Sequence, residues 1–305
     1  MFRIIVFAAA LALGASAPFG TAGTAPRPAP DASEAVSVLS APASSLETQV
    51  DAWIAELSKD EPFSAWSGAT WRKAPLGPGT HGWIVFVQDA RSGEPLGYLI
   101  VAATPEGGYA LVEYGAGATP PFADATLETA FGSDGLEGVR FTDEAAIEPL
   151  YFDPLHAFWK VSEGGVTRYA DAVTGAWLPA TDAETEALAK EKQRREPDMV
   201  YSGKRLHMMK QPGDPYGSIA WLEAPDAEIG GWDDFVAWFD ARGDGEAVYV
   251  GAAWGGDALA PFGVAGYHGW PSRRDGGLGG YVALDQEGLT RYAPLETLLA
   301  AGSFR

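Results

Sequence analysis

Three residues in the last third of the chain have the side-chain types of a serine-hydrolase triad. Ser218 has the hydroxyl for nucleophilic attack, His268 the imidazole of a general base, and Asp285 a carboxylate that would orient the imidazole. No Gly-x-Ser-x-Gly elbow surrounds the serine, and its position after Gly217 is typical of a residue that caps a helix. A hydrolase therefore stays an alternative function, and capping is the expected role of Ser218.

The other ionisable residues do not form a recognisable site. Asp233 with Asp234, and Asp143 with Glu144, are adjacent in sequence, and adjacent side chains point to different faces of a helix or strand. Glycosidase chemistry is therefore not expected from them. The four histidines lie far apart in the sequence: His81, His156, His207 and His268. With no zinc, calcium, phosphate or dinucleotide motif, the sequence predicts no metal site and no cofactor.

Cysteine is absent from all 305 residues of the chain. A disulfide therefore cannot stabilise the fold, and a thiolate cannot serve as a nucleophile. The absence excludes every mechanism that depends on an attacking cysteine.

Aromatic residues offer a second kind of site. Trp254 and Trp270 lie in glycine-rich stretches, which predicts exposed loops, and Tyr267 lies close to the second of them. Trp and Tyr combine a large contact area with a polar group and are enriched in recognition surfaces. These three residues are the predicted binding residues, for a peptide or, as an alternative, for a cell-wall carbohydrate.

The N-terminus has the pattern of an export signal. Arg3 precedes an apolar run over 4–17, and the small residues that follow allow cleavage after Ala17 or Ala22. The run is shorter than the ~20 residues of a spanning helix. We therefore expect a signal peptide over 1–22, no membrane span after cleavage, and a secreted protein in the medium or the cell wall.

The chain is strongly acidic, with a formal net charge of −20 at pH 7. Such a surface repels nucleic-acid phosphates and anionic lipid headgroups. The expected partner is therefore a peptide or a secreted or cell-wall protein, and not a nucleic acid.

Hydrophobic patterning predicts a mixed α+β protein. A capping box of Ser44 and Glu47 starts a helix with one apolar face. Strands are expected at 83–87, 96–103 and 109–114, then a short helix at 123–131 and a hairpin of 157–162 with 166–170. The second half predicts a helix at 232–239, strands at 247–253, 262–267 and 280–284, and a final helix that starts at Pro294.

The segment 183–196 separates the two halves. It is rich in helix formers, and Leu188 is its only strongly apolar residue, which predicts an exposed connecting helix. The densest basic run of the chain lies here and is expected to face solvent: Lys190, Lys192, Arg194 and Arg195.

Each half resembles a known kind of module. In the first, the stretch 95–101 followed by 113–115 resembles the propeptide-like modules of secreted streptopain-type cysteine peptidases. The hairpin of 158–161 with 169–171, followed by Thr174 and Gly175, resembles the closing hairpin of a PepSY-type domain. The resemblance implies a module that inhibits, chaperones or escorts a peptidase.

In the second half, the segments 262–267 and 280–285 and the closing helix resemble papain-like peptidases of the bacteriocin-processing type. The resemblance places four residues at the active-site positions of that family: Gln211 at the oxyanion glutamine, Tyr216 at the cysteine, Ala260 (or Pro261) at the histidine, and Asp285 at the orienting aspartate. It also implies that a nucleophile helix begins near Tyr216.

Tyr216 and Ala260 cannot supply a thiolate and an imidazole, so the mechanism of the family is lost. The sequence thus predicts an exported pseudo-peptidase that binds a peptide or protein partner without catalysis, in a hollow lined by the four residual positions. The expected organisation is a signal peptide (1–22), a disordered linker rich in Ala and Pro (23–43), a propeptide-like or PepSY-like module (44–180), a connecting helix (181–200) and a degenerate papain-like module (201–305).

Overall fold

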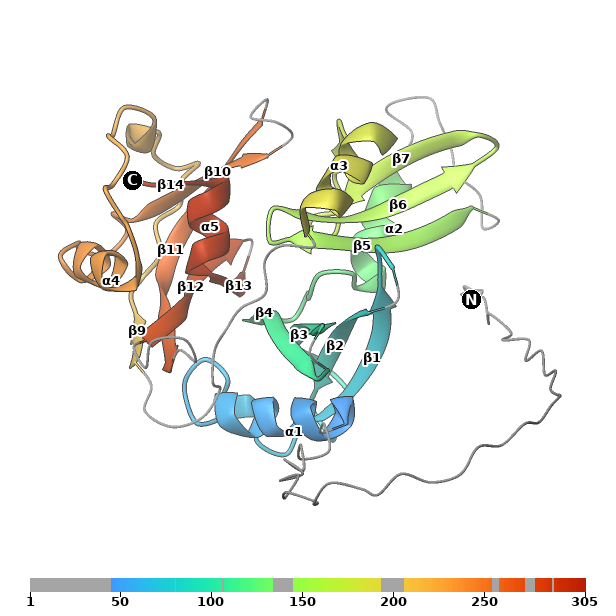
Figure 1. The fold of residues 1–305 in the computed structure, drawn as a ribbon, viewed down its shortest axis with the longest axis horizontal. Coiled ribbons are helices and arrows are strands. Elements are labelled where there is room, and N and C mark those ends of the chain that lie inside the picture. Colours follow the sequence, from blue (N-terminus) through green and yellow to red (C-terminus); the bar gives the residue numbers. More distant parts are fainter. Residues whose placement is uncertain are drawn as a thin grey trace, which may run out of the picture. The chain divides into compact units, whose positions relative to one another are not determined.

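A computed structural model describes residues 45–79, 81–105, 107–133, 145–192, 206–253, 258–271, 278–286 and 288–305 (Figure 1). All of these residues belong to one compact unit, Ala43–Arg305. The expected signal peptide and nearly all of the expected linker precede this unit and lie outside the described residues, so both stay predictions.

The described residues form two antiparallel sheets, which confirms the α+β class. The larger sheet has the order β1-β2-β3-β4-β13-β12-β11-β10-β14, with β9 also paired to β11. Its strands are β1 (Thr70–Leu76), β2 (Gly82–Gln88), β3 (Pro95–Ala103), β4 (Tyr109–Ala116), β9 (Leu206–Met209), β10 (Val248–Ala253), β11 (Ala258–Pro271), β12 (Leu278–Gln286), β13 (Leu289–Pro294) and β14 (Gly302–Phe304). The smaller sheet has the order β5 (Ala146–Asp153), β6 (His156–Glu163), β7 (Val166–Asp171) and β8 (Trp177–Leu178).

Five α-helices pack against these sheets in the part of the chain that the structure describes (Figure 1). They are α1 (Leu46–Leu57), α2 (Asp124–Ser133), α3 (Asp182–Lys192), α4 (Trp232–Asp240) and α5 (Leu295–Ala301), and two short 3-10 helices are η1 (Ser64–Trp66) and η3 (Ala220–Leu222).

The first helix forms where its apolar face predicts it. The buried residues are the expected ones: Leu46, Val50, Trp53, Ile54 and Leu57. The cap differs from the prediction, because Ser45 and not Ser44 precedes the first turn, and its hydroxyl accepts a hydrogen bond from the Thr48 N–H at 3.2 Å. Glu47 lies 2.5 Å from the Lys73 ammonium of β1, so it forms a bond to the sheet in place of the expected capping box.

Sequence patterning missed the strands β1, β5, β9, β13 and β14. Of these, β1 and β5 have weak apolar signals. Only Leu76 of β1 is buried. The first half of β5 is largely accessible to solvent, and its buried residues occur only at 150–152. Each of these two strands lies at the end of its sheet, where edge strands lack the regular alternation that identifies a half-buried strand.

Strands from the two predicted modules share the larger sheet. The strand β4 pairs with β13, with Tyr114 opposite Tyr292 and Ala116 opposite Thr290. The boundary expected near residue 200 therefore does not separate two sheets, because hydrogen bonds between β4 and β13 continue one sheet across it.

The helix α3 differs from the exposed connector that its polarity predicts. Leu188 and Ala189 pack against a cluster of the smaller sheet that contains Phe158 and Tyr169. The Tyr169 hydroxyl donates a hydrogen bond to Asp182 at the start of the helix. One apolar residue with a small neighbour is thus enough to dock this helix.

The larger sheet buries side chains on both faces. Consecutive residues of a strand point to opposite faces, and Ile84 and Val85 belong to different clusters. The cluster of Val85 lies under α1, whereas that of Ile84 includes residues of the smaller sheet. In the same way, Val282 belongs to the cluster of α4 and α5, whereas Ala283 belongs to the cluster under α1. The core under α1 therefore contains strands from both halves of the chain.

The helix α4 docks on the sheet through Trp232, whose indole lies over Gly269 of β11 and Gly280 of β12. These two glycines are cross-strand partners. A Cβ on Gly280 would lie 2.1 Å from two carbons of the indole. The glycines of this region thus permit close packing inside strands and do not mark loops.

Candidate binding surface

The segment expected to begin a nucleophile helix forms a turn. The turn is closed by a hydrogen bond from the Gly217 N–H to the Asp214 carbonyl at 3.1 Å, and the three-residue helix η3 follows. Tyr216 projects from this turn and is 78 % exposed. Ser218 does not cap an α-helix, and its hydroxyl lies 3.5 Å from the Ala220 N–H at the start of η3.

The other residual positions do not meet in one hollow. Ala260 packs against the cluster under α4 and α5. Leu284 belongs to the same cluster, so the alternation along β12 turns Asp285 to the opposite face of the sheet. Burial raises the pKa of the Asp285 carboxyl above its ordinary value. The backbone carbonyl of Gln211 accepts a hydrogen bond from the Gly245 N–H, which lies just before β10. The expected common hollow is therefore not formed.

His268 is a buried residue of the core, with 0 % of its surface exposed. Its Nδ1 lies 3.0 Å from the Tyr114 hydroxyl, which accepts a hydrogen bond from the indole N–H of Trp270 at 3.2 Å. Its Nε2 faces the Asp60 carboxylate at 3.3 Å. A carboxylate oxygen beside Nε2 favours the tautomer with its proton on that nitrogen, so that Nδ1 accepts from Tyr114.

This placement does not provide the serine-hydrolase arrangement. A general base must lie within about 3.2 Å of its nucleophile, or one water away. Ser218 is exposed in the segment after β9, whereas both nitrogens of His268 face partners inside the core. The buried imidazole instead joins the segment after α1 to β4 and β11.

The prediction that Trp270 is exposed is wrong. Its side chain is 0 % exposed, and its indole lies against His268 with 4.3 Å between ring centroids. Tyr267 is also buried; its hydroxyl donates to Asp240 at 3.1 Å, and burial raises its pKa to about 12. Trp254 lies outside the described residues. A carbohydrate surface made of Trp254 and Trp270 is thus not available, because Trp270 belongs to the core.

A buried ion pair at the junction of β4 and β13 was missed by the sequence analysis. Glu113 accepts hydrogen bonds from Arg291 at both carboxylate oxygens, at 2.9 Å from Nε and 3.3 Å from Nη2. It also accepts from the hydroxyls of Tyr98 and Tyr151, the latter at 2.7 Å. Arg291 donates its third bond to the Gln286 side chain at 2.8 Å. These residues come from both halves of the larger sheet and from β5 of the smaller one.

The ion pair has the properties of a structural element. Burial, followed by the negative charge of Glu113, raises the pKa of both Tyr98 and Tyr151 well above the ordinary range. Burial alone would lower the pKa of Arg291, but the adjacent carboxylate outweighs it and raises that pKa. Both tyrosines therefore stay neutral donors and Arg291 stays charged, which holds the two sheets together through one satisfied network.

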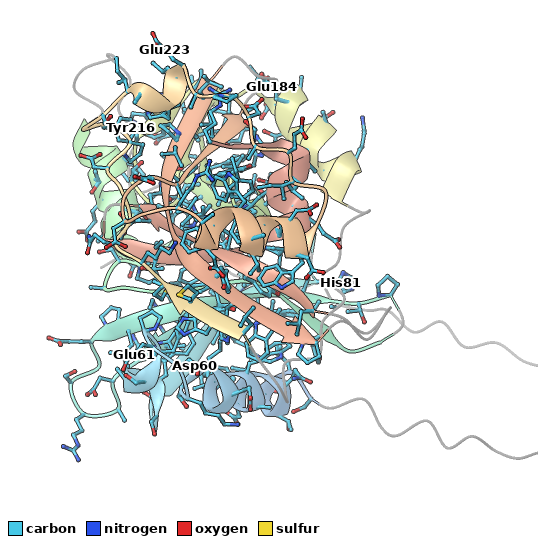
Figure 2. All side chains as sticks on the ribbon, turned by 90° about the vertical axis from the view of Figure 1, so that its left-hand side faces the viewer. Asp60, Glu61, His81, Glu184, Tyr216 and Glu223 are labelled. Carbon is cyan, nitrogen blue, oxygen red and sulfur yellow. The ribbon has the colours of Figure 1, made fainter. Side chains whose placement is uncertain are left out.

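Exposed apolar side chains concentrate in one segment of the molecule. Among the described residues, eight large hydrophobic side chains are exposed, and six of them lie within 206–222: Leu206, Met208, Met209, Tyr216, Ile219 and Leu222. The segment that leads from β9 to α4 crosses the face turned toward the viewer in Figure 2, where Tyr216 and Glu223 are labelled near its upper end. Exposed apolar patches of this kind mark interaction sites.

The six side chains form two groups. The first three belong to β9, a strand whose one partner in the described part of the chain is β11. The other three follow the turn, and we call Tyr216, Ile219 and Leu222 the Tyr216 ridge. The ridge contains the most exposed of the six, since Tyr216 and Ile219 are 78 % and 66 % exposed.

Hydrogen bonds anchor the turn that carries the Tyr216 ridge. The indole N–H of Trp221 donates to the Pro215 carbonyl at 2.7 Å, and Arg305 Nη1 donates to the backbone carbonyl of Trp221 at 3.3 Å. The Leu222 N–H bonds to the Ile219 carbonyl at 3.0 Å, and side chains three residues apart in such a turn lie on the same side. The exposure of these residues is thus a feature of an anchored turn.

No group of three or more His, Asp or Glu side chains in the described residues is arranged to hold a metal ion. None of the described helices is both long and apolar enough to cross a membrane.

Comparisons of the chain with protein-family models, with curated proteins and with solved structures found no match. The resemblances to peptidase modules therefore have no support from relatives.

Proposed function

We propose that this chain is an exported, non-catalytic binding protein whose Tyr216 ridge contacts a peptide or a segment of a secreted or cell-wall protein. The observation that carries the proposal is the concentration of six exposed apolar side chains within 206–222. Export rests on the N-terminal sequence pattern. The proposal does not depend on descent from a peptidase, because it rests on the exposed apolar side chains and not on the residual active-site positions.

Two properties of the ridge favour binding. Tyrosine at the centre of an interface often contributes a large share of the binding free energy. The hydrogen bonds that anchor the turn restrict its conformational freedom, so a partner has less of it to order on association. The hydrogen bonds of Trp221 therefore support affinity as well as exposure.

Binding without catalysis is favoured by the positions of the reactive groups. His268 and Glu113 are fully buried and engaged with neighbouring side chains. The hydroxyl of Ser218, on the exposed segment, lies 3.5 Å from the Ala220 N–H. A partner on the ridge would thus meet apolar side chains and surface carboxylates.

The triple variant Tyr216→Ser/Ile219→Ser/Leu222→Ser tests this function. The full chain is labelled and applied to an array of immobilised random-sequence peptides. We expect the unmodified chain to retain a subset of the peptides, and the variant to bind that subset about tenfold or more weakly, because apolar contacts at the centre of an interface are lost. Mass spectrometry should find the retained peptides intact after incubation.

The matched control is Val166→Ser/Leu259→Ser, which removes the other two large hydrophobic side chains that are exposed among the described residues. The control should bind the array like the unmodified chain, and circular dichroism should be the same for all three proteins. Equal binding by the triple variant, or cleavage of the peptides, would contradict the proposed function.

A further inference from the structure

We infer that the partner of the Tyr216 ridge is a cationic, amphipathic polypeptide segment, in which Lys or Arg residues stand next to large apolar residues. The inference rests on the proposed binding function and adds the chemical class of the ligand. It is carried by the charges that surround the ridge.

The stretch of chain that holds the ridge contains only negative charges. Residues 211–241 include seven acidic residues and neither Lys nor Arg: Asp214, Glu223, Asp226, Glu228, Asp233, Asp234 and Asp240. All seven side chains are exposed. An apolar surface in such an acidic stretch attracts a partner that brings positive charge and repels one that brings negative charge.

Three of these carboxylates lie close to the ridge. Asp214 Oδ1 accepts a hydrogen bond from the Tyr216 N–H at 2.9 Å, so its charge lies beside the tyrosine backbone. Glu223 follows Leu222 directly and is exposed (Figure 2). Asp226 lies 2.7 Å from Arg305 Nε.

The three carboxylates differ in what they can offer to a ligand. Hydrogen bonds from Ser303 and then from Arg305 lower the pKa of Asp226, so it stays ionised, and the Arg305 guanidinium at 2.7 Å offsets its charge within the molecule. In the described part of the chain, Asp214 and Glu223 form no ion pair. These two carboxylates are thus available to a cation on a partner, one near each end of the ridge.

A second copy of this chain is a poorer occupant. A two-fold contact of ridge on ridge would place the same acidic stretch against itself. Like charges that meet across an interface suppress association. A ligand with Lys or Arg beside its apolar residues satisfies both the ridge and the acidic stretch that holds it.

Fluorescence anisotropy with the full chain and a set of labelled peptides tests the inference. The probe is a peptide of alternating lysine and leucine, and its two counterparts replace lysine by glutamate or leucine by serine. We expect the lysine–leucine peptide to bind and each counterpart to bind about tenfold or more weakly, since each lacks one of the two complementary features. The affinity for the probe should fall as salt is added.

Variants separate the role of the charges from that of the ridge. Asp214→Asn/Glu223→Gln should weaken binding of the probe several-fold and reduce its salt dependence, because the two free carboxylates are removed while the Asp214 acceptor oxygen is kept. The matched control Glu128→Gln/Glu186→Gln, at exposed carboxylates elsewhere, should leave binding unchanged.

The outcomes distinguish a failure of this inference from a failure of the proposed binding function on which it rests. If the triple ridge variant weakens binding but Asp214→Asn/Glu223→Gln does not, or if the glutamate–leucine peptide binds equally well, the cationic partner is wrong and the binding function stands. If the triple variant binds the probe like the unmodified chain, both fail. Equal binding of the lysine–serine peptide would reduce the effect to charge alone and overturn the inference. The inference would also be overturned if sedimentation detected a dimer of the unmodified chain that the triple variant does not form.

Discussion

The variant Arg291→Met should lose about 3–5 kcal/mol of unfolding free energy, because it leaves the buried Glu113 carboxylate without its cation. Glu113 is 0 % and Arg291 3 % exposed, so water cannot replace the lost partner. The two tyrosine hydroxyls that remain are neutral donors and compensate only in part. Chemical denaturation followed by circular dichroism measures the loss.

Two further variants show whether the loss of unfolding free energy is caused by the uncompensated charge of Glu113. The double variant Glu113→Gln/Arg291→Met removes both charges and should recover a large part of the lost stability. The pair of Lys59 and Glu56 gives the matched control, because Lys59→Met removes a cation whose side chain is 57 % exposed and should cost less than about 1 kcal/mol. A cost below about 1 kcal/mol for Arg291→Met itself would show that the ion pair is not buried as described.

The second large effect is expected for Trp270→Ala, at about 3–5 kcal/mol of unfolding free energy. The indole is fully buried beside His268, and its N–H bonds to Tyr114. Removing it leaves a cavity and deprives the buried hydroxyl of a donor. Thermal and chemical denaturation both report this change.

The matched control is Tyr216→Ala, at an aromatic residue that is 78 % exposed. It should change the unfolding free energy by less than about 0.5 kcal/mol. If Trp270→Ala were as mild as Tyr216→Ala, then Trp270 would be exposed, as its sequence neighbours suggest, and the description of the core under α1 would be wrong.

Local patterns in the sequence predicted local structure well. The apolar face of α1 and the strands β2, β3 and β4 occur where the helical spacing and the apolar runs of the sequence place them. Trp270 shows the limit of such patterns. The glycine-rich stretch around it predicted a loop, but the strand β11 continues to Pro271. Gly266 lacks a side chain because the Met208 carbonyl of β9 would lie 2.1 Å from its Cβ, and glycine signals do not tell a loop from a close approach.

Contacts between distant segments were beyond the reach of the sequence. Glu113 and Arg291 lie in different predicted modules, and no local spacing pairs them. Neither does any spacing bring Asp60 to His268. The Tyr216 ridge did leave a signal, since its apolar residues recur at every third position in an acidic stretch. That period fits neither an α-helix nor a strand, and the patterns of those two elements therefore overlook it.

The most direct test of the proposed surface is amide hydrogen exchange of the full chain, measured by mass spectrometry with and without the lysine–leucine peptide at saturation. We predict slower exchange in residues 214–223, the turn and short helix that present the Tyr216 ridge. The bound peptide would reduce the local opening that exposes the backbone amides of this segment to exchange. Unchanged exchange in 214–223, with slowing in another part of the molecule, would contradict the account.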